Sequence, residues 1–197
     1  NAYANVADAQ VPAHLAGIVS AVHGLQNVHT SHTMHKVYEP DAQVATSSAV
    51  GHNPMDFPSI YDANGLAPAT NTTIAIISEG NISQTLTDLA QFATNNGLTQ
   101  PTVQEIDVGA AGTDTSGLIE WDMDSQSSLA AAGGKVAKMI FYVSTTLDDA
   151  PLTEAYNQAV TDNVAKVINV SLGECEKAAQ SSGIEASDDA ISQVAVA

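Results

Sequence analysis

The spacing of apolar residues divides the chain into an irregular first part and a regular second part. From about residue 72, short continuous apolar runs alternate with stretches whose apolar residues recur every three to four positions. The first pattern is typical of buried parallel strands, and the second of amphipathic helices. The predicted strands are 73–77, 103–108, 136–143 and 166–170, and the predicted helices are 84–96, 117–132, 152–164 and one that starts near residue 187.

This alternation determines the expected fold class. Strands that alternate with helices of about a dozen residues indicate right-handed βαβ crossovers. We therefore expect an α/β fold with a doubly wound, mainly parallel sheet, helices on both faces and about four core strands from this chain. The last helix runs to the end of the sequence without a cap, and no strand follows it. We expect the chain to be the first part of a longer one.

The first 58 residues have a different composition. Residues 1–36 hold five of the six histidines. An amphipathic stretch follows Pro12, with Gly24 as its expected stop. Its apolar residues at helical spacing are Leu15, Ile18, Val19 and Val22. Residues 37–58 carry three prolines with Ser, Thr and Gly between them, and this composition predicts a linker or an extended arm.

Charge narrows the possible partners. The 197 residues include 22 acids, five lysines and no arginine, for a net charge of −17. Such a chain repels nucleic-acid phosphates and anionic lipid surfaces, so we expect neither as a partner. An acidic surface suits a protein that works at low pH, although ordinary solubility explains it more simply. The lone Cys175 is either a buried small hydrophobe or a half-cystine whose partner lies outside the chain.

The residues with the clearest chemistry lie in the helix predicted over 117–132. There Glu120 and Asp124 are four positions apart and share one side, while Asp122 points roughly the opposite way. In a partly dry cleft the pair would share a proton, and one pKa would rise above its ordinary value. Such a pair can accept a hydroxyl proton under acidic conditions, where a histidine base is protonated. The structural alternative is that acids in the first turns of a helix simply complement its dipole.

The stretch Glu-Trp-Asp-Met-Asp-Ser-Gln at 120–126 resembles the helix motif of sedolisins, the serine-carboxyl peptidases. Other stretches resemble the same family in the same order: 51–62 the start of the mature enzyme, 73–80 its first strand, and 157–173 a later helix and strand that ends in Val-Ser-Leu-Gly. Residues 1–36 resemble the C-terminal end of the family's propeptide. The resemblance therefore implies a propeptide remnant and linker over 1–45 and the N-terminal half of a catalytic domain over 46–197.

The resemblance also implies a fold and a function. The fold would be subtilisin-like, and the protein a secreted, acid-acting endopeptidase made as a zymogen. Glu120 would be the general base that takes the proton of a serine hydroxyl, and Asp124 would hydrogen-bond and tune Glu120. Trp121 would shape the cleft, with a plain core tryptophan as the alternative. The residues that match the strand which pairs with an extended protein or peptide substrate are Ser171, Leu172 and Gly173.

Several family features are missing or altered. No Gly-Thr-Ser nucleophile motif occurs, nor a match for the oxyanion aspartate or the calcium loop. We therefore expect this chain alone to be inactive, its partner to be the remaining C-terminal half, and calcium to bind there and not here. In some members the counterpart of Cys175 pairs with a later cysteine. Glu174 stands where close relatives tend to carry an aromatic residue. Ser78 stands where some carry a glutamate, and Glu79 lies one place off, on the opposite face of its strand.

Residues 37–50 are expected to contain the maturation site. The five histidines before it would become charged as the pH falls through ~6.5, and the acidic catalytic half would at first attract them. Further acidification neutralises the carboxylates, so the segment could act as a pH-gated release element. The alternative is that these histidines are solvated and have no role.

Two other function classes remain open. One is a glycoside hydrolase with two carboxylates, although such carboxylates usually flank the scissile bond from separate elements. The other is an inactive α/β fragment or binding module of the same shape. A Gly-Thr-Ser segment on a companion chain would decide against the second class.

Overall fold

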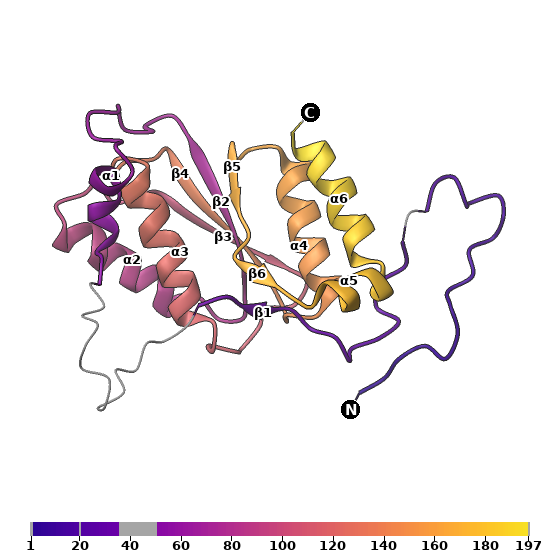
Figure 1. The fold of residues 1–197 in the computed structure, drawn as a ribbon. Helices are drawn as coiled ribbons and strands as arrows, with labels where there is room; N and C mark the ends of the chain where they lie inside the picture. Colours follow the sequence, from indigo (N-terminus) through magenta and orange to yellow (C-terminus); the bar gives the residue numbers. More distant parts are fainter. Residues whose placement is uncertain (1, 20, 36–50, 197) are drawn as a thin grey trace, which may run out of the picture.

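The computed structural model describes residues 2–19, 21–35 and 51–196. Its centre is a parallel four-stranded sheet with the order β3-β4-β2-β5 (Figure 1). The strands are β2 (Thr73–Glu79), β3 (Val103–Val108), β4 (Lys138–Ser144) and β5 (Val167–Asn169). The predicted α/β class with about four parallel core strands is confirmed.

The two central strands explain the continuous apolar runs. In the register, Ile74 lies beside Met139 and Ile76 beside Phe141. Both strands are buried on both faces from their second residue to their last, so their sequences show no polar alternation. The outer strand β3 has one neighbour and keeps exposed polar residues.

Helices cover both faces, as Figure 1 shows. Ile74 and Ile76 of β2 pack in one core cluster with residues of α2 (Ser83–Asn95) and α3 (Leu118–Ala131). Ala75 and Ile77 point the other way, into a cluster with α4 (Asp149–Asp162). The last helix α6 (Ile184–Ala195) packs against α4, after the short α5 (Glu176–Ser182). Alternate residues of one strand thus anchor opposite layers, as a doubly wound sheet requires.

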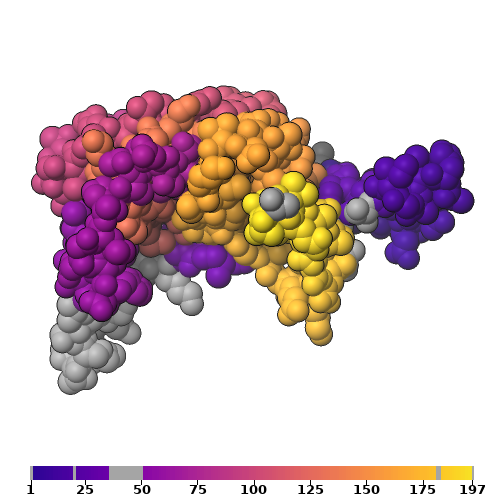
Figure 2. All heavy atoms as spheres, turned by 90° about the horizontal axis from the view of Figure 1, so that it is seen from above, coloured from indigo at the N-terminus to yellow at the C-terminus, as the bar shows by residue number. Residues whose placement is uncertain are grey.

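The first part of the chain departs from the predictions. The amphipathic helix predicted after Pro12 is wrong: residues 13–18 form turns, with Leu15 N–H donating to Pro12 O and Ile18 N–H to Leu15 O. Ile18 is 78% exposed, so the apolar stripe has little to pack against and stabilises no helix. The N-terminal residues protrude to one side of the body, as Figure 2 shows in indigo.

Short elements account for the other departures. The end of the linker predicted over 37–58 forms η1 (Pro54–Asp56) and the start of α1 (Phe57–Ile60), and α5 was not predicted. A second sheet pairs β1 (His32–Thr33) with β6 (Leu172–Gly173) in antiparallel fashion. The predicted maturation site at 37–50 and the predicted domain boundary at 45–46 lie outside the described residues.

Candidate active site

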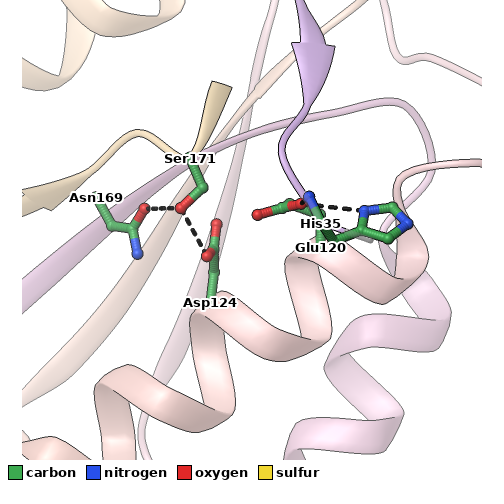
Figure 3. Close-up of polar contacts among 5 residues, drawn as sticks. All are labelled: His35, Glu120, Asp124, Asn169 and Ser171. Carbon is green, nitrogen blue, oxygen red and sulfur yellow. Dashed lines mark hydrogen bonds and ion pairs between the residues drawn. The ribbon is translucent and has the colours of Figure 1, made fainter. Parts of the chain in front are cut away.

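Helix α3 presents Glu120 and Asp124 from successive turns, and both are buried, at 1% and 6% exposure (Figure 3). Asp122 faces away from them toward α2, where its pKa is raised to about 6 by burial and then by Asp88. The helix therefore separates its acids as the spacing predicts, with one pair on the side of β6 and one acid on the side of α2.

Glu120 binds a residue from the first part of the chain. Its Oε2 accepts the backbone N–H of His35 at 2.6 Å and lies 3.0 Å from Nδ1 of the same residue. His35 follows β1 directly, so the path of that strand brings it to the carboxylate. The contact occupies one of the two carboxylate oxygens of Glu120.

Asp124 binds on the other side, to the residue just before β6. Ser171 Oγ lies 2.7 Å from Asp124 Oδ1 and 2.9 Å from Asn169 Oδ1 (Figure 3). One hydroxyl proton cannot serve both acceptors. In one arrangement a protonated Asp124 donates to Ser171 Oγ, and Ser171 donates to Asn169 Oδ1. In the other, Ser171 donates to Asp124, and Asn169 turns its amide NH₂ toward the hydroxyl and donates to it.

The electrostatics of Asp124 favour its protonated form. Burial raises its pKa to about 6, the bond from Ser171 works against this, and the charge of Glu120 adds to the rise. The hydrogen bond predicted between Glu120 and Asp124 is absent among the described residues, because each carboxylate has found another partner. The two acids therefore interact through charge, and Asp124 contacts the β6 side of the site through Ser171.

An extended segment of the chain, residues 30–35, lies in a groove beside these acids. On one side His32 pairs with Gly173 and Thr33 with Leu172. On the other side Ser31 N–H donates to Leu147 O at 2.9 Å. Residues 30–35 thus form an extended segment, with β1 at its centre, that is held from both sides and ends at Glu120. The strand predicted to bind an extended peptide holds one here, supplied by the chain itself.

Trp121 is buried and Cys175 is exposed. Trp121 is 1% exposed, belongs to the core cluster and donates from Nε1 to Glu79 O at 3.2 Å. It therefore does not line the groove, and the core alternative is correct. Cys175 is exposed, so its interpretation as a buried hydrophobe is wrong. Its pairing with a later cysteine stays a prediction.

Sequence reasoning missed the roles of His35 and Glu79. The histidine-rich composition drew attention to His35, but its partner depends on a strand pairing that local pattern does not encode. Glu79 does point to the opposite face from Ser78, yet it is 4% exposed at the end of β2. Burial, and then the charge of Asp114, raise its pKa to about 7. A carboxylate directly after an apolar run was the available signal.

Neither a metal-binding cluster nor a membrane-spanning helix occurs in the part of the chain that the structure describes. No group of three or more His, Cys, Asp or Glu within that part of the chain could hold a metal ion. None of its helices is long and apolar enough to cross a membrane.

The fold and the site together define the class: an α/β protein whose buried carboxylates adjoin a groove that holds extended polypeptide. The chain is 49% identical over 203 residues to sedolisin from Pseudomonas sp. (strain 101), over 99% of this chain and 35% of that protein. It is 46% identical over 213 residues to xanthomonalisin from Xanthomonas sp. (strain T-22), over 99% and 26% respectively.

A solved structure agrees. It is described as Pseudomonas sedolisin, a serine-carboxyl proteinase, complexed with two molecules of pseudo-iodotyrostatin. The TM-score is 0.70 at 48% identity, over 76% of this chain and 42% of that one. No family model matches the chain. The chain belongs to the sedolisin family and has its subtilisin-like α/β fold, and it spans about a third or less of the length of these curated relatives.

Proposed function

We propose that this chain is the N-terminal part of an acid-acting serine-carboxyl endopeptidase, with Glu120 as general base and Asp124 in support. The antiparallel pairing of β1 with β6 carries the proposal. It supports the proposal because an extended segment of the chain itself lies along β6 and leads to the buried carboxylate pair. A protease substrate must be presented to its catalytic groups in this manner.

The chemistry follows from the protonation of the pair. Burial, with a further contribution from the charge of Glu120, raises the pKa of Asp124 to about 6, so Asp124 holds a proton below that pH. A serine hydroxyl from outside this chain attacks the substrate carbonyl carbon and passes its proton to Glu120. Glu120 returns that proton to the leaving amine as the peptide C–N bond breaks and an acyl-enzyme forms. Water then repeats the sequence and releases the acid product.

We further propose that residues 1–45 are the end of a propeptide. Residues 30–35 occupy the groove, and His35 holds Glu120 Oε2, so the base is blocked while this segment is bound. This supports a zymogen that is activated when the segment leaves. Secretion, and a calcium ion in the remaining C-terminal half, stay part of the proposal on family grounds.

The test uses the complete enzyme, with an unstructured protein as substrate at pH ~3–4. Glu120→Ala and Asp124→Ala should each reduce cleavage by at least ~10³-fold, the scale for loss of a catalytic-triad member. Asp122→Ala is the matched control, because that acid lies on the same helix but faces α2. Cleavage by the 20.3 kDa chain alone would contradict a nucleophile outside it. Tight peptide binding without cleavage by the complete protein would favour the binding module.

A further inference from the structure

Ser31 occupies a distinctive position in the groove. Exposure alternates along the segment: Ser31, Thr33 and His35 are partly buried, while the residues between them are exposed. Side chains of an extended strand alternate in direction, so these three point toward the body of the protein. His35 reaches Glu120, and Ser31 is the inward residue four positions before it.

Two hollows meet at Ser31. The first has a volume of about 440 Å³ and is lined by Ser31, Thr30, the end of β2 and the loops around Asp114 and Thr145. Glu79 lines it with a side chain that is 96% buried, being 4% exposed. Its Oε2 has no hydrogen-bond partner among the described residues. A buried carboxylate oxygen without a partner is costly, so a ligand that brought a donor to Glu79 Oε2 would be stabilised in this hollow.

The second hollow, of about 320 Å³, lies on the β6 side and shares Ser31 with the first. Both carboxylate oxygens of Glu174 are buried there, again without a hydrogen-bond partner among the described residues. The other acids that line it are Asp149, Glu185, Asp188 and Asp189. Burial, and then Asp149, raise the pKa of Glu174, while His29 and His32 of the N-terminal segment act in the opposite direction.

The two hollows share one chemical deficiency. No lysine lines either of them as the structure describes them, and the sequence contains no arginine. The hydroxyl of Ser31 offers a single donor proton. A longer side chain at the same position, with several N–H donors and a positive charge, would supply what the buried carboxylates of Glu79 and Glu174 lack.

We infer that the groove position of Ser31 is a cation-selecting subsite, which takes a lysine or arginine side chain of a bound peptide, with Glu79 and Glu174 as the selecting residues. The inference deepens the proposed function, because it rests on the groove being a peptide-binding site. It concerns a position four residues before the one that reaches Glu120, away from the reacting bond.

The chain carries its own occupant, so the subsite can be tested without catalysis. Ser31→Lys, Ser31→Glu and the uncharged length control Ser31→Met are made in the 197-residue chain at pH 8, where Glu79 is ionised. Amide hydrogen exchange at residues 31–33 reports how often the segment leaves the groove. Ser31→Lys should slow exchange roughly tenfold, Ser31→Glu should speed it by a similar factor, and Ser31→Met should lie between them.

Substitutions of Glu79 and Glu174 test whether these two carboxylates cause the difference in exchange between Ser31→Lys and Ser31→Glu. Glu79→Gln and Glu174→Gln should each shrink the difference between Ser31→Lys and Ser31→Glu several-fold, and Asp122→Asn should leave it unchanged. Slow exchange of the amides in β2 and β4 shows in each sample that the sheet is folded. If one of the two glutamine variants fails to fold, the other one still tests the charge coupling. Equal exchange for Ser31→Lys and Ser31→Glu, or a difference that survives both glutamine variants, would overturn the inference.

Peptide cleavage by the complete enzyme separates this inference from the proposed function. Substrates that differ only in Lys or Glu at the matching position should diverge in kcat/KM as the pH is raised toward about 7, the pKa of Glu79, because that carboxylate becomes charged there. Charge coupling in the exchange experiment without any cleavage would reject the peptidase and leave the subsite standing. Glu120-dependent cleavage with no charge coupling at Ser31 would reject the subsite and leave the peptidase standing.

Discussion

His35 and Glu120, 85 positions apart in sequence, are joined by two contacts to one carboxylate oxygen: the backbone N–H at 2.6 Å and the ring Nδ1 at 3.0 Å. The backbone contact does not depend on the side chain, whereas the ring contact does. The two can therefore be separated by substitution. A substitution that removes only the ring contact measures how much the imidazole contributes to holding residues 30–35 in the groove.

His35→Ala should loosen the N-terminal segment without releasing it. Loss of a hydrogen bond to a charged group costs about 1.5 kcal/mol, which corresponds to roughly tenfold faster amide exchange at residues 32–35. Exchange of the amides in β4 should not change. His14→Ala is the matched control, because His14 is exposed in the turns at 13–18. Equal effects of the two substitutions would mean that the ring contact contributes nothing specific.

The chain should be more stable at pH 5 than at pH 8. Asp124 and Glu79 have folded-state pKa values of about 6 and 7, above their ordinary 3.8 and 4.5. Between pH ~4 and ~7 the folded chain therefore binds more protons than the unfolded chain, and the free energy of unfolding rises as the pH falls. The gain should be of the order of 3 kcal/mol, since each pKa unit is worth ~1.4 kcal/mol.

Urea unfolding at several pH values measures this gain. Asp124→Asn should flatten the part of the curve near pH 6, because the amide cannot titrate. Asp62→Asn, at a position where no hydrogen bond from the side chain is described, is a surface control. A stability maximum near neutral pH would contradict the buried, proton-holding state of these acids.

The sequence predicted the parts of the fold that depend on local pattern. Strands β2 and β4 are buried on both faces, which explains their unbroken apolar runs. Helix α3 is buried on one face, which explains its helical spacing of apolar residues. The pairing of β1 with β6 could not be predicted, because two-residue strands about 140 positions apart have no periodicity.

The part of the candidate site that depends on local spacing could also be predicted from the sequence. The i, i+4 spacing placed Glu120 and Asp124 together on α3, because one helix fixes that relation. Their partners, His35 and Ser171, come from other elements, and only the tertiary fold decides them. The direct bond expected between the two acids was wrong for this reason. Glu79 was predicted only as an acid one place off a family glutamate, and its burial was not predicted because a single acid after a strand is common in a chain with 22 acids.

Ser171→Ala should raise the pKa of Asp124 further. The bond from Ser171 holds that pKa down against burial, so its removal shifts the value above about 6. Carbon-13 NMR titration of the Asp124 carboxyl measures the shift directly. Ser171→Thr keeps a hydroxyl at the same place and should leave the pKa near its original value. An unchanged pKa in Ser171→Ala would show that Ser171 donates only to Asn169.

Gly80→Ala should destabilise the chain strongly, through the turn that follows Glu79. Gly80 has φ of +78°, and an added Cβ would clash with the backbone oxygen of Asp114. A side chain there pays for the left-handed conformation and also forces the loop around Asp114 away from β2. We expect a loss of about 3 kcal/mol in the free energy of unfolding, more than the conformation alone costs.

Gly97→Ala isolates the conformational part of that loss. Gly97 has φ of +65°, but an added Cβ would meet no atom within 4 Å, so only the left-handed backbone is penalised, by about 1 kcal/mol. The difference between the two substitutions in urea unfolding reports the clash with Asp114. Because this loop also lines the hollow above Glu79, Gly80→Ala should open that hollow to water and move the pKa of Glu79 down toward 4.5. Equal destabilisation by both substitutions would mean that the loop around Asp114 moves aside at no cost in free energy. It would also mean that this loop does not exclude water from Glu79.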